Sequence, residues 1–284
     1  MSFIEYEHLS DNFLHEVEKL SDNNFNIYYL IHAFYSVNKG GMDFYDAWIF
    51  KKSESWAIGL RVDGMYLIYG NDEDDSIISK LNERINNEEV DYLQGFHFSG
   101  TKAILDKLMK KANFDFEIYK ERYFYTLVER KEVFKKNVEN VTIRKSTIND
   151  LSIIAQMNSD YNSFEWKGKN NRTAEEFKPL LKENVRNGVF FIIEFNNEKV
   201  GFCSVMSFLS KINNMIGTIY IEENHRNKNL GTILLSHAIN ELLKNAEKIY
   251  LMTDMQSLSS NKLVENAGFE KNYEYSDLIF KKYK

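Results

Sequence analysis

The chain has 284 residues, of which 43% are hydrophobic, and it carries a formal net charge of −6. This length suits either one large domain or two domains of about 100 to 200 residues each. The single cysteine, Cys203, excludes an internal disulfide and a cysteine-based zinc site, and the six histidines show no paired metal-ligand spacing. We therefore expect no bound metal.

The composition also argues against two kinds of partner. Phosphate contacts require clustered Lys and Arg, and this acidic chain has no long basic face, so nucleic acid is not an expected ligand. The longest apolar runs, such as Val189–Ile193, fall well short of the roughly 20 residues that a membrane span requires. The N-terminus lacks a basic region followed by an apolar one. We expect a cytoplasmic protein that binds no membrane.

The first half of the chain alternates predicted strands and helices. Trp56–Arg61 and Met65–Tyr69 flank a Val-Asp-Gly turn, which is typical of a β-hairpin. Hydrophobic periodicity then predicts a helix, a strand, a helix and a strand, over Ser76–Ile85, Val90–Phe96, Lys102–Lys111 and Tyr119–Leu127. The aromatic stretches Tyr28–Tyr35 and Tyr119–Tyr125 are candidate walls of a ligand pocket, with core packing as the alternative.

A charged stretch, Glu129–Asn140, interrupts the apolar pattern, and a new pattern begins at Val141. Such a change predicts a domain boundary, with one domain over residues 1–132 and another over residues 140–284. A solvated loop inside one domain is the alternative.

The second half predicts a similar alternation. Short apolar runs predict strands at Val141–Arg144, Val189–Phe195, Lys199–Phe208, Met215–Ile221, Ile249–Thr253, Tyr273–Tyr275 and Leu278–Lys282. Apolar residues at helical spacing predict helices that contain Asn149–Met157, Thr173–Val185, Leu234–Leu243 and Ser259–Asn266. Thr173 and Glu176 have the spacing of a capping box, and the last two strands are expected to close the sheet. Because the first half repeats this order more faintly, we interpret the chain as an internal duplication; ordinary α/β alternation is the alternative.

The segment His225–Thr232, HRNKNLGT, lies between the predicted strand Met215–Ile221 and an amphipathic helix. The free backbone N–H groups at a helix N-terminus, together with the positive end of the helix dipole, form an anion site. Gly231 permits close approach of the backbone to a ligand, and Arg226 and Lys228 add positive charge. A pyrophosphate fits such a site.

The residues from Ile219 to Gly231 resemble motif A of the GNAT (GCN5-related N-acetyltransferase) superfamily. That motif reads Arg or Gln, two residues, Gly, one residue, Gly or Ala. Arg226 and Gly231 match it, and Leu230 suits the apolar position between the two glycines. Asn229 replaces the first glycine, and asparagine tolerates left-handed backbone angles better than most residues.

Three further features strengthen the resemblance. The order of elements from Val141 to Lys282 is similar to the whole GNAT fold. Ile143 and Arg144 with Asp150 and Leu151 resemble its first strand and helix, and the segment after Glu265, Asn-Ala-Gly-Phe, resembles its closing turn. The resemblance implies an α/β protein of two GNAT-like domains, each a mixed, mostly antiparallel twisted sheet flanked by helices. The N-terminal domain would be a degenerate copy.

The resemblance implies acetyl-CoA as the co-substrate. Its pyrophosphate would lie on the backbone N–H groups of Asn227–Thr232, and its pantetheine arm would pair with the backbone of Tyr220 and Ile221. Ser257 aligns roughly with a family Asn that contacts the pantetheine. The residues implied to bind the cofactor are Ile219, Tyr220, Ile221, Arg226, Asn227, Lys228, Asn229, Leu230, Gly231, Thr232 and Ser257.

In the family mechanism a base takes a proton from an amine, the amine attacks the thioester directly, and a Tyr protonates the leaving thiolate. Here Val264 stands where the Tyr is expected, and Gly217 and Met215 stand where the base is often found. Glu222 is a candidate base through water, and Tyr220 is a candidate acid. An exposed acidic loop and core packing are the alternatives for these two residues.

The first half has an acidic segment at the place that corresponds to His225–Thr232. Asn71–Asp75 contains four carboxylates, which would repel a pyrophosphate. We therefore expect the first domain to bind no CoA and to shape the acceptor pocket or to stabilise the fold.

The function expected from these features is transfer of an acetyl group from acetyl-CoA to a primary amine of a small molecule or peptide. A non-catalytic acyl-CoA-binding sensor or interaction module is the alternative, because the usual acid and base are missing. A purely structural or partner-binding chain is a third reading. The sequence leaves the acceptor and the oligomeric state open.

Overall fold

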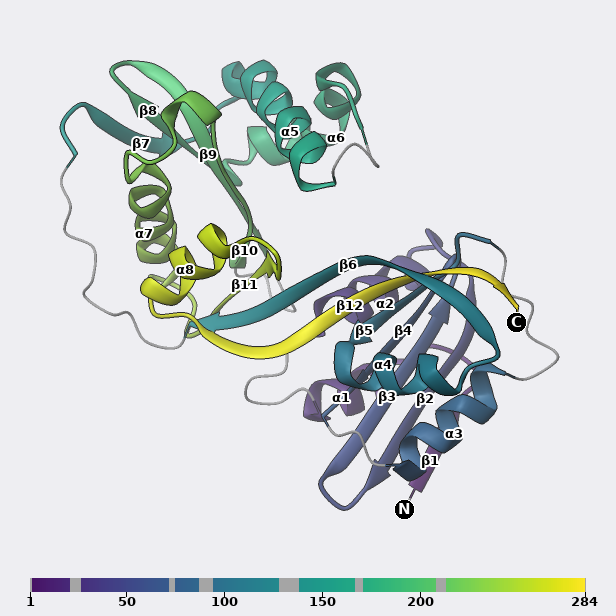
Figure 1. Ribbon diagram of the computed structural model, residues 1–284. Coiled ribbons are helices and arrows are strands. Elements are labelled where there is room, and N and C mark those ends of the chain that lie inside the picture. Colours follow the sequence, from purple (N-terminus) through teal and green to yellow (C-terminus); the bar gives the residue numbers. More distant parts are fainter. Residues whose placement is uncertain are drawn as a thin grey trace. The chain divides into compact units, whose positions relative to one another are not determined.

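The structure is a computed structural model, and it describes residues 2–20, 27–71, 75–86, 94–127, 138–166, 171–207 and 213–283 (Figure 1). The chain forms two compact units that are interleaved in sequence. The first contains Met1–Tyr125, Thr253–Ser257 and Lys271–Lys284, and the second contains Thr126–Met252 and Leu258–Glu270. Within the described ranges, no helix combines the length and the apolar character needed to cross a membrane.

The described helices and strands follow the same order in two successive parts of the chain. The first part runs β1 (Ser2–Tyr6), α1 (Asp11–Leu20), α2 (Tyr28–Asn38), β2 (Phe44–Lys52), β3 (Ser55–Val62), β4 (Met65–Gly70), α3 (Asp75–Ile85), β5 (His97–Thr101), α4 (Lys102–Lys111) and β6 (Phe114–Leu127). The second runs β7 (Val141–Lys145), α5 (Leu151–Glu165), α6 (Ala174–Arg186), β8 (Phe190–Phe195), β9 (Glu198–Ser207), β10 (Asn213–Ile221), α7 (Leu230–Leu242), β11 (Ile249–Asp254), α8 (Leu258–Asn266) and β12 (Glu270–Tyr283). The predicted repetition is confirmed. The domain limits 1–132 and 140–284 stay a prediction, and most of the charged stretch between them lies outside the described residues.

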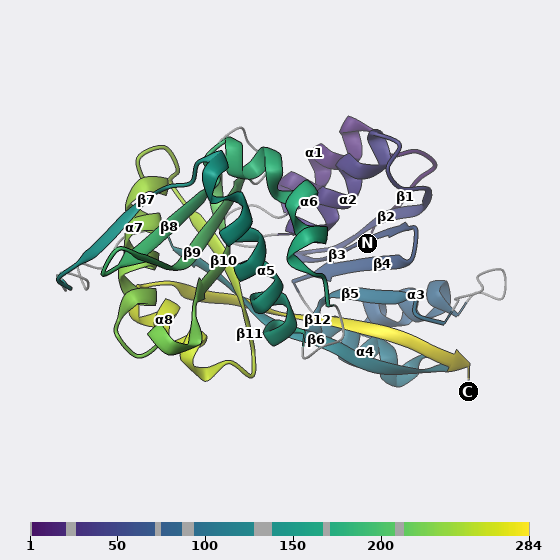
Figure 2. The ribbon, with the colours of Figure 1, turned by 90° about the horizontal axis from the view of Figure 1, so that it is seen from above.

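In the first unit the strand order is β1-β2-β3-β4-β5-β12-β6. Strands β1 to β4 are antiparallel neighbours, and β5 is parallel to β4. Helices α1 and α2 lie on one side of this sheet, and α3 and α4 lie on the other (Figure 2). The buried residues of α3 recur at helical spacing, at Ile77, Ile78, Leu81 and Ile85, so that one face of the helix packs into the core.

The strand β12 corrects one expectation from the sequence. The segments expected to close the second sheet instead form a single strand that pairs with β5 of the first unit, with Tyr275 opposite Thr101. Leu278 and Phe280 are buried in the core of that unit. The expectation was wrong because an alternating apolar pattern defines a strand and its buried face but does not specify which sheet receives it.

In the second unit the strand order is β7-β8-β9-β10-β11, and all neighbours are antiparallel except β10 and β11. The predicted hairpin of β8 and β9 is confirmed. Its turn residues Asn196 and Asn197 have φ angles of 52° and 66°, as the favoured two-residue hairpin turn requires. Helices α5 and α6 cover one face of the sheet and α7 covers the other (Figure 2). Ile154, Met157 and Val185 pack the first of these faces.

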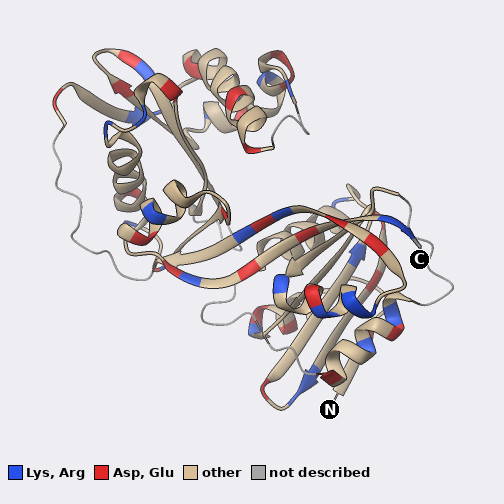
Figure 3. Ribbon diagram, in the orientation of Figure 1, with Lys and Arg blue, Asp and Glu red and all other residues tan. Residues whose placement is uncertain are grey.

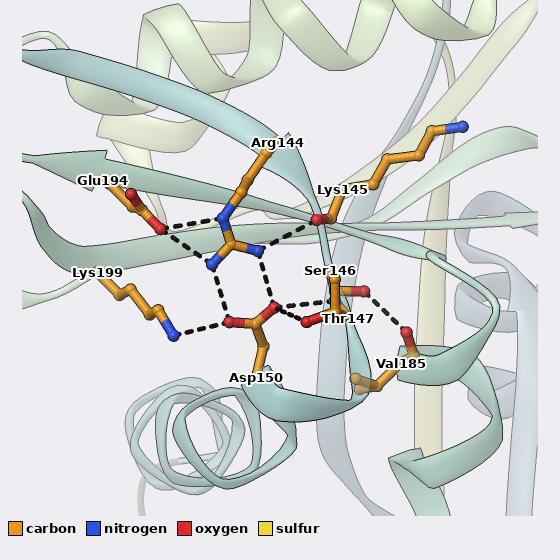
Figure 4. A network of polar contacts seen from close by, with 8 residues as sticks. All are labelled: Arg144, Lys145, Ser146, Thr147, Asp150, Val185, Glu194 and Lys199. Atoms are coloured by element: carbon orange, nitrogen blue, oxygen red, sulfur yellow. Dashed lines mark hydrogen bonds and ion pairs between the residues drawn. The ribbon is translucent and has the colours of Figure 1, made fainter.

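A buried carboxylate holds the beginning of the second unit together (Figure 4). Asp150 is 1% exposed, and its two oxygens accept from the Arg144 guanidinium at 2.8 and 2.9 Å. Lys199 Nζ lies 2.7 Å from Asp150 Oδ1, and the Thr147 amide donates to Oδ2 at 2.8 Å. These donors hold the pKa of the Asp150 carboxyl well below its usual range, with the Arg144 hydrogen bonds as the largest cause. The network joins β7, β9 and the start of α5.

We expect Asp150→Asn to lower the free energy of unfolding by about 2 to 3 kcal/mol, because it removes the charge that Arg144 and Lys199 share. Urea unfolding followed by circular dichroism measures the change. Asp160→Asn is the matched control, since Asp160 is exposed on α5 and, among the described residues, accepts only from Gln156; its effect should stay within about 0.5 kcal/mol. Equal effects of the two variants would contradict the role given to Asp150.

Candidate functional site

Strand β10 carries a β-bulge. Its pairing with β9 shifts by one residue between Ile216 and Ile219, so that Gly217 and Thr218 together stand opposite Ser204. The Ser204 hydroxyl accepts a hydrogen bond from the Thr218 amide at 2.8 Å. A bulge interrupts the ladder and increases the local twist of the strand. The Ser204 side chain therefore supplies the acceptor that the interrupted ladder leaves missing.

Beyond the bulge, β10 separates from β11. The two strands are paired in parallel over only two residue pairs, from Met215 opposite Tyr250 to Ile216 opposite Leu251. Residues 219–221 remain paired with β9 on the other side. Successive backbone groups of a strand point to its two sides, so the groups of 217–221 on the β11 side have no partner among the described strands. An extended ligand can pair with such an edge.

The corresponding strands of the first part have no such opening. Strand β4 pairs with β3 without any shift of register. It also pairs in parallel with β5 over four residue pairs, from Met65 opposite His97 to Ile68 opposite Gly100. The same element order therefore gives a closed strand pair in one part of the chain and an open pair in the other.

The loop after β10 contains two asparagines with left-handed backbone angles. It begins with a short 3-10 turn, Glu223–His225, after which Asn227 and Asn229 have φ angles of 63° and 60°. Asn229 is the N-cap residue of α7, and its side chain makes no capping hydrogen bond. Asn229 therefore takes the backbone angle that glycine favours at this place in the motif, as the sequence predicts.

The first turn of α7 presents unpaired amides. The first hydrogen bond of the helix runs from the Ile233 amide to the Asn229 carbonyl at 3.1 Å. The amides of Leu230, Gly231 and Thr232 precede it and have no acceptor within the helix. The first turn contains no acidic residue. These donors and the positive end of the helix dipole favour a bound anion.

The fold itself does not require glycine at position 231. A Cβ there would lie 3.8 Å from Ile221 Cγ1 and 3.8 Å from Leu263 Cδ2, both ordinary contact distances, and its φ is not positive. A glycine at this position is therefore not needed for folding, and it keeps the space beside the helix N-terminus free for a ligand.

Arg226 and Lys228, the basic residues of this loop, both donate hydrogen bonds to nearby backbone carbonyls. Arg226 Nε donates to the Ile221 carbonyl at 3.0 Å, and the guanidinium lies 5.1 Å from the ring centre of Phe164. Lys228 Nζ donates to the Asn224 carbonyl at 3.2 Å. Both residues thus stabilise the shape of the loop as well as adding charge. Along the described elements, basic residues are interspersed with acidic ones (Figure 3).

The candidate acid and base occupy different environments. Tyr220 is 9% exposed, and its ring packs near Tyr161 and Phe202. Burial raises the pKa of the Tyr220 hydroxyl above its ordinary value. The Glu222 side chain is half-buried, with Oε2 3.7 Å from His225 Nδ1. The assignments of Glu222 as base and Tyr220 as acid stay predictions.

Three other residues named from the sequence lie as follows. Ser257 belongs to the segment grouped with the first unit, and its amide donates to the Asp254 carbonyl at 3.0 Å; its contact with a ligand stays a prediction. Val264 is buried. Cys203 is fully buried, and burial raises the pKa of its thiol, which suits packing rather than nucleophilic chemistry. Among the described residues, no group of three or more His, Cys, Asp or Glu could hold a metal ion.

The second unit contains a pocket that no single sequence motif predicts. A pocket of about 330 Å³ lies between α5, α6, β8 and β9, and it is lined by Asn158, Leu181, Asn184, Val189, Phe190, Ser204, Val205 and Met206. Because four separate elements contribute, sequence periodicity marks these residues only as parts of their own helices and strands. The one local signal is Gly217, since a glycine inside a strand often marks a bulge.

Known proteins share this architecture. The fold is similar to that of an acetyltransferase of the GNAT family from Colwellia psychrerythraea, with a TM-score of 0.61, 10% identity and full coverage of both chains. It is also similar to a tandem GNAT protein from the clavulanic acid biosynthesis pathway, with a TM-score of 0.58, 10% identity and coverage of 99% of this chain and 98% of that one. A third similar structure is a GCN5-related N-acetyltransferase from Sphaerobacter thermophilus, with a TM-score of 0.52 and 14% identity. The match covers 80% of this chain and 76% of that one.

These likenesses define the class: a mixed, largely antiparallel α/β protein with the GNAT fold. Residues 152–269 match the model of the Acetyltransferase (GNAT) family, so this segment is a domain of that family. The segment contains the bulged strand β10, the loop with Asn227 and Asn229, and α7. The family supports an acyltransferase of the N-acetyltransferase type. The sequence matches no curated protein.

We expect Asn229→Gly to keep the free energy of unfolding within about 0.5 kcal/mol of the wild type, since the Asn229 side chain makes no cap. Asn229→Val should lower it by about 1 to 2 kcal/mol, because a β-branched residue is strained at a φ of 60°. Urea unfolding of both variants tests this. Equal losses would show that the amide side chain, rather than the backbone angle, matters at this position.

Proposed function

We propose that the chain transfers an acetyl group from acetyl-CoA to a primary amine. The observation that carries this proposal is that a strand edge without a described strand partner, 217–221, is followed along the chain by amides at the start of α7 that have no acceptor within the helix. The first suits an extended chain that carries amide groups, and the second suits a pyrophosphate. Acetyl-CoA contains both parts in the same order.

In this proposal the amides of Asn227–Thr232 bind the pyrophosphate, and the backbone of Ile219, Tyr220 and Ile221 guides the pantetheine. The thioester then lies near the bulge. The amine nitrogen attacks the thioester carbonyl carbon, the carbon–sulfur bond breaks, and the thiolate takes up a proton while the new amide nitrogen loses one. Positioning of the two reactants can supply much of the rate acceleration.

A non-catalytic acyl-CoA-binding module is the second candidate. It is favoured by the buried Val264 and Met215, at positions where the family resemblance implies an acid and a base. A thiol-release assay over a panel of amines separates the two functions. Release of CoA that depends on an amine supports the transferase, whereas tight binding of acetyl-CoA without any release supports the module.

We also propose that the first part of the chain is a degenerate GNAT copy that binds no acyl-CoA. The closed pair of β4 and β5 supports this, because it leaves no unpaired edge for a pantetheine arm. Residues 72–74, which carry three of the four carboxylates in the acidic counterpart of the phosphate loop, lie outside the described residues. The expected cytoplasmic location and the expected absence of metal, nucleic-acid and membrane partners stay predictions.

We expect Gly231→Glu to raise the Kd for acetyl-CoA by roughly tenfold or more, because it adds a negative charge beside the proposed pyrophosphate. The variant should keep its stability, since an acidic residue in the first turn of a helix is favourable and a Cβ has space there. Isothermal titration calorimetry measures the affinity. Asn240→Glu adds the same charge near the other end of α7 and should change the Kd little. An unchanged Kd in Gly231→Glu would contradict the phosphate site.

A further inference from the structure

The pocket between α5, α6, β8 and β9 adjoins the bulge of β10. Ser204, which lines the pocket, also binds the Thr218 amide of the bulge. A Cβ at Gly217 would lie 2.5 Å from Met206 Cε and 2.9 Å from Ser204 Oγ, so two lining side chains lie directly against the bulge. Under the proposed function, on which this inference rests, the thioester lies at that bulge. The pocket is therefore placed to hold the acceptor.

The pocket offers two directed polar groups. Asn158 Nδ2 donates to the Ile154 carbonyl at 2.9 Å, and the Asn158 amide oxygen has no hydrogen-bond donor among the described residues, so it can act as an acceptor. Ser204 Oγ accepts from the Thr218 amide, which leaves its O–H as a donor. The remaining described lining consists of the exposed Asn184 and five apolar residues, Leu181, Val189, Phe190, Val205 and Met206. These neutral polar groups on a largely apolar wall can orient an amine without any ionic contact.

Among the described residues, no charged side chain belongs to the lining. Most of the charged residues described on the neighbouring elements have partners elsewhere, and Lys182 of α6 is exposed. Their ion pairs and hydrogen bonds join Lys178 to Glu175, Arg186 to Glu183, Lys199 to Asp150, Arg144 to Glu194 and Gln156 to Asp160. A carboxylate or an ammonium group that entered this pocket would lose water without gaining a counter-charge, which is unfavourable.

We propose that this pocket selects a primary amine whose body is otherwise apolar and uncharged, and that it discriminates against acceptors that carry a carboxylate or an additional ammonium group. The amine enters as the free base, and its lone pair attacks the thioester carbonyl carbon. The carbon–sulfur bond breaks, and the proton lost by the nitrogen balances the proton gained by the thiolate. The Asn158 amide oxygen accepts from the amine N–H and orients the lone pair. An enzyme base at Met215 or Gly217 is then not needed to prepare the amine.

Three amines with the same aromatic body test the selectivity: phenethylamine, phenylalanine, and 2-(4-aminomethylphenyl)ethylamine. We expect kcat/KM for phenethylamine to exceed those for the other two by at least about tenfold, because each added charge is buried without a partner. The assay measures CoA release with the full chain and acetyl-CoA. Equal or higher kcat/KM for the charged analogues would overturn the acceptor class while leaving the transferase function in place.

Asn184→Asp provides a sharper test at the rim of the pocket. Asn184 is exposed and lines the pocket, and its side chain makes no hydrogen bond within the described residues, so the new carboxylate should not disturb the fold. We expect it to raise kcat/KM for the diamine relative to phenethylamine by about fivefold or more. Asn187→Asp adds the same charge at the end of α6, outside the lining, and should leave the ratio unchanged.

These outcomes distinguish failure of the proposed acceptor pocket from failure of the proposed transferase function. A shift of the ratio in Asn184→Asp and not in Asn187→Asp supports the pocket as the acceptor site. The same ratio in both variants and in the wild type would overturn it. No turnover of any amine, with acetyl-CoA binding intact by calorimetry, would overturn the transferase function itself and the acceptor class with it.

Discussion

Two residues of β10, Gly217 and Thr218, stand opposite the single residue Ser204 of β9, and this mismatch governs the geometry of the second unit. The Ser204 hydroxyl accepts from the Thr218 amide and so stabilises the interruption of the ladder. Parallel pairing with β11 ends immediately before the bulge. The backbone beyond it is left open on one side, and the same strand leads directly into the loop and helix terminus that suit an anion. The acceptor pocket we propose contacts the bulge through the same serine.

The duplicated first part provides an internal comparison. It has the same order of elements, but β4 is regular, and it pairs with β5 over four residue pairs. Gly100 has a φ of 149°, and a Cβ there would overlap the carbonyl oxygen of Ile68, so glycine permits the close approach that keeps the pair shut. The regular register of β4 and its close pairing with β5 at one glycine are the physical basis of the proposal that the first part binds no acyl-CoA.

Local features of this structure could be predicted from the sequence, and features that depend on several elements could not. The capping box of Thr173 and Glu176 and the left-handed Asn229 follow from local backbone chemistry, and both are present. The partner of β12 could not be predicted, because its alternating pattern would suit either sheet. The inward turn of Arg226 onto the Ile221 carbonyl and the convergence of four elements on one pocket depend on tertiary packing, which spacing along the chain does not record.

We propose that the second unit binds acetyl-CoA through its backbone, along the edge of β10 and at the start of α7. Hydrogen–deuterium exchange with and without saturating acetyl-CoA tests it most directly, because exchange reports on the amides themselves. We expect slower exchange in peptides that span 217–232 and no change in Met65–Gly70, the regular strand of the first part. Unchanged exchange over 217–232, or protection confined to the first part, would contradict it.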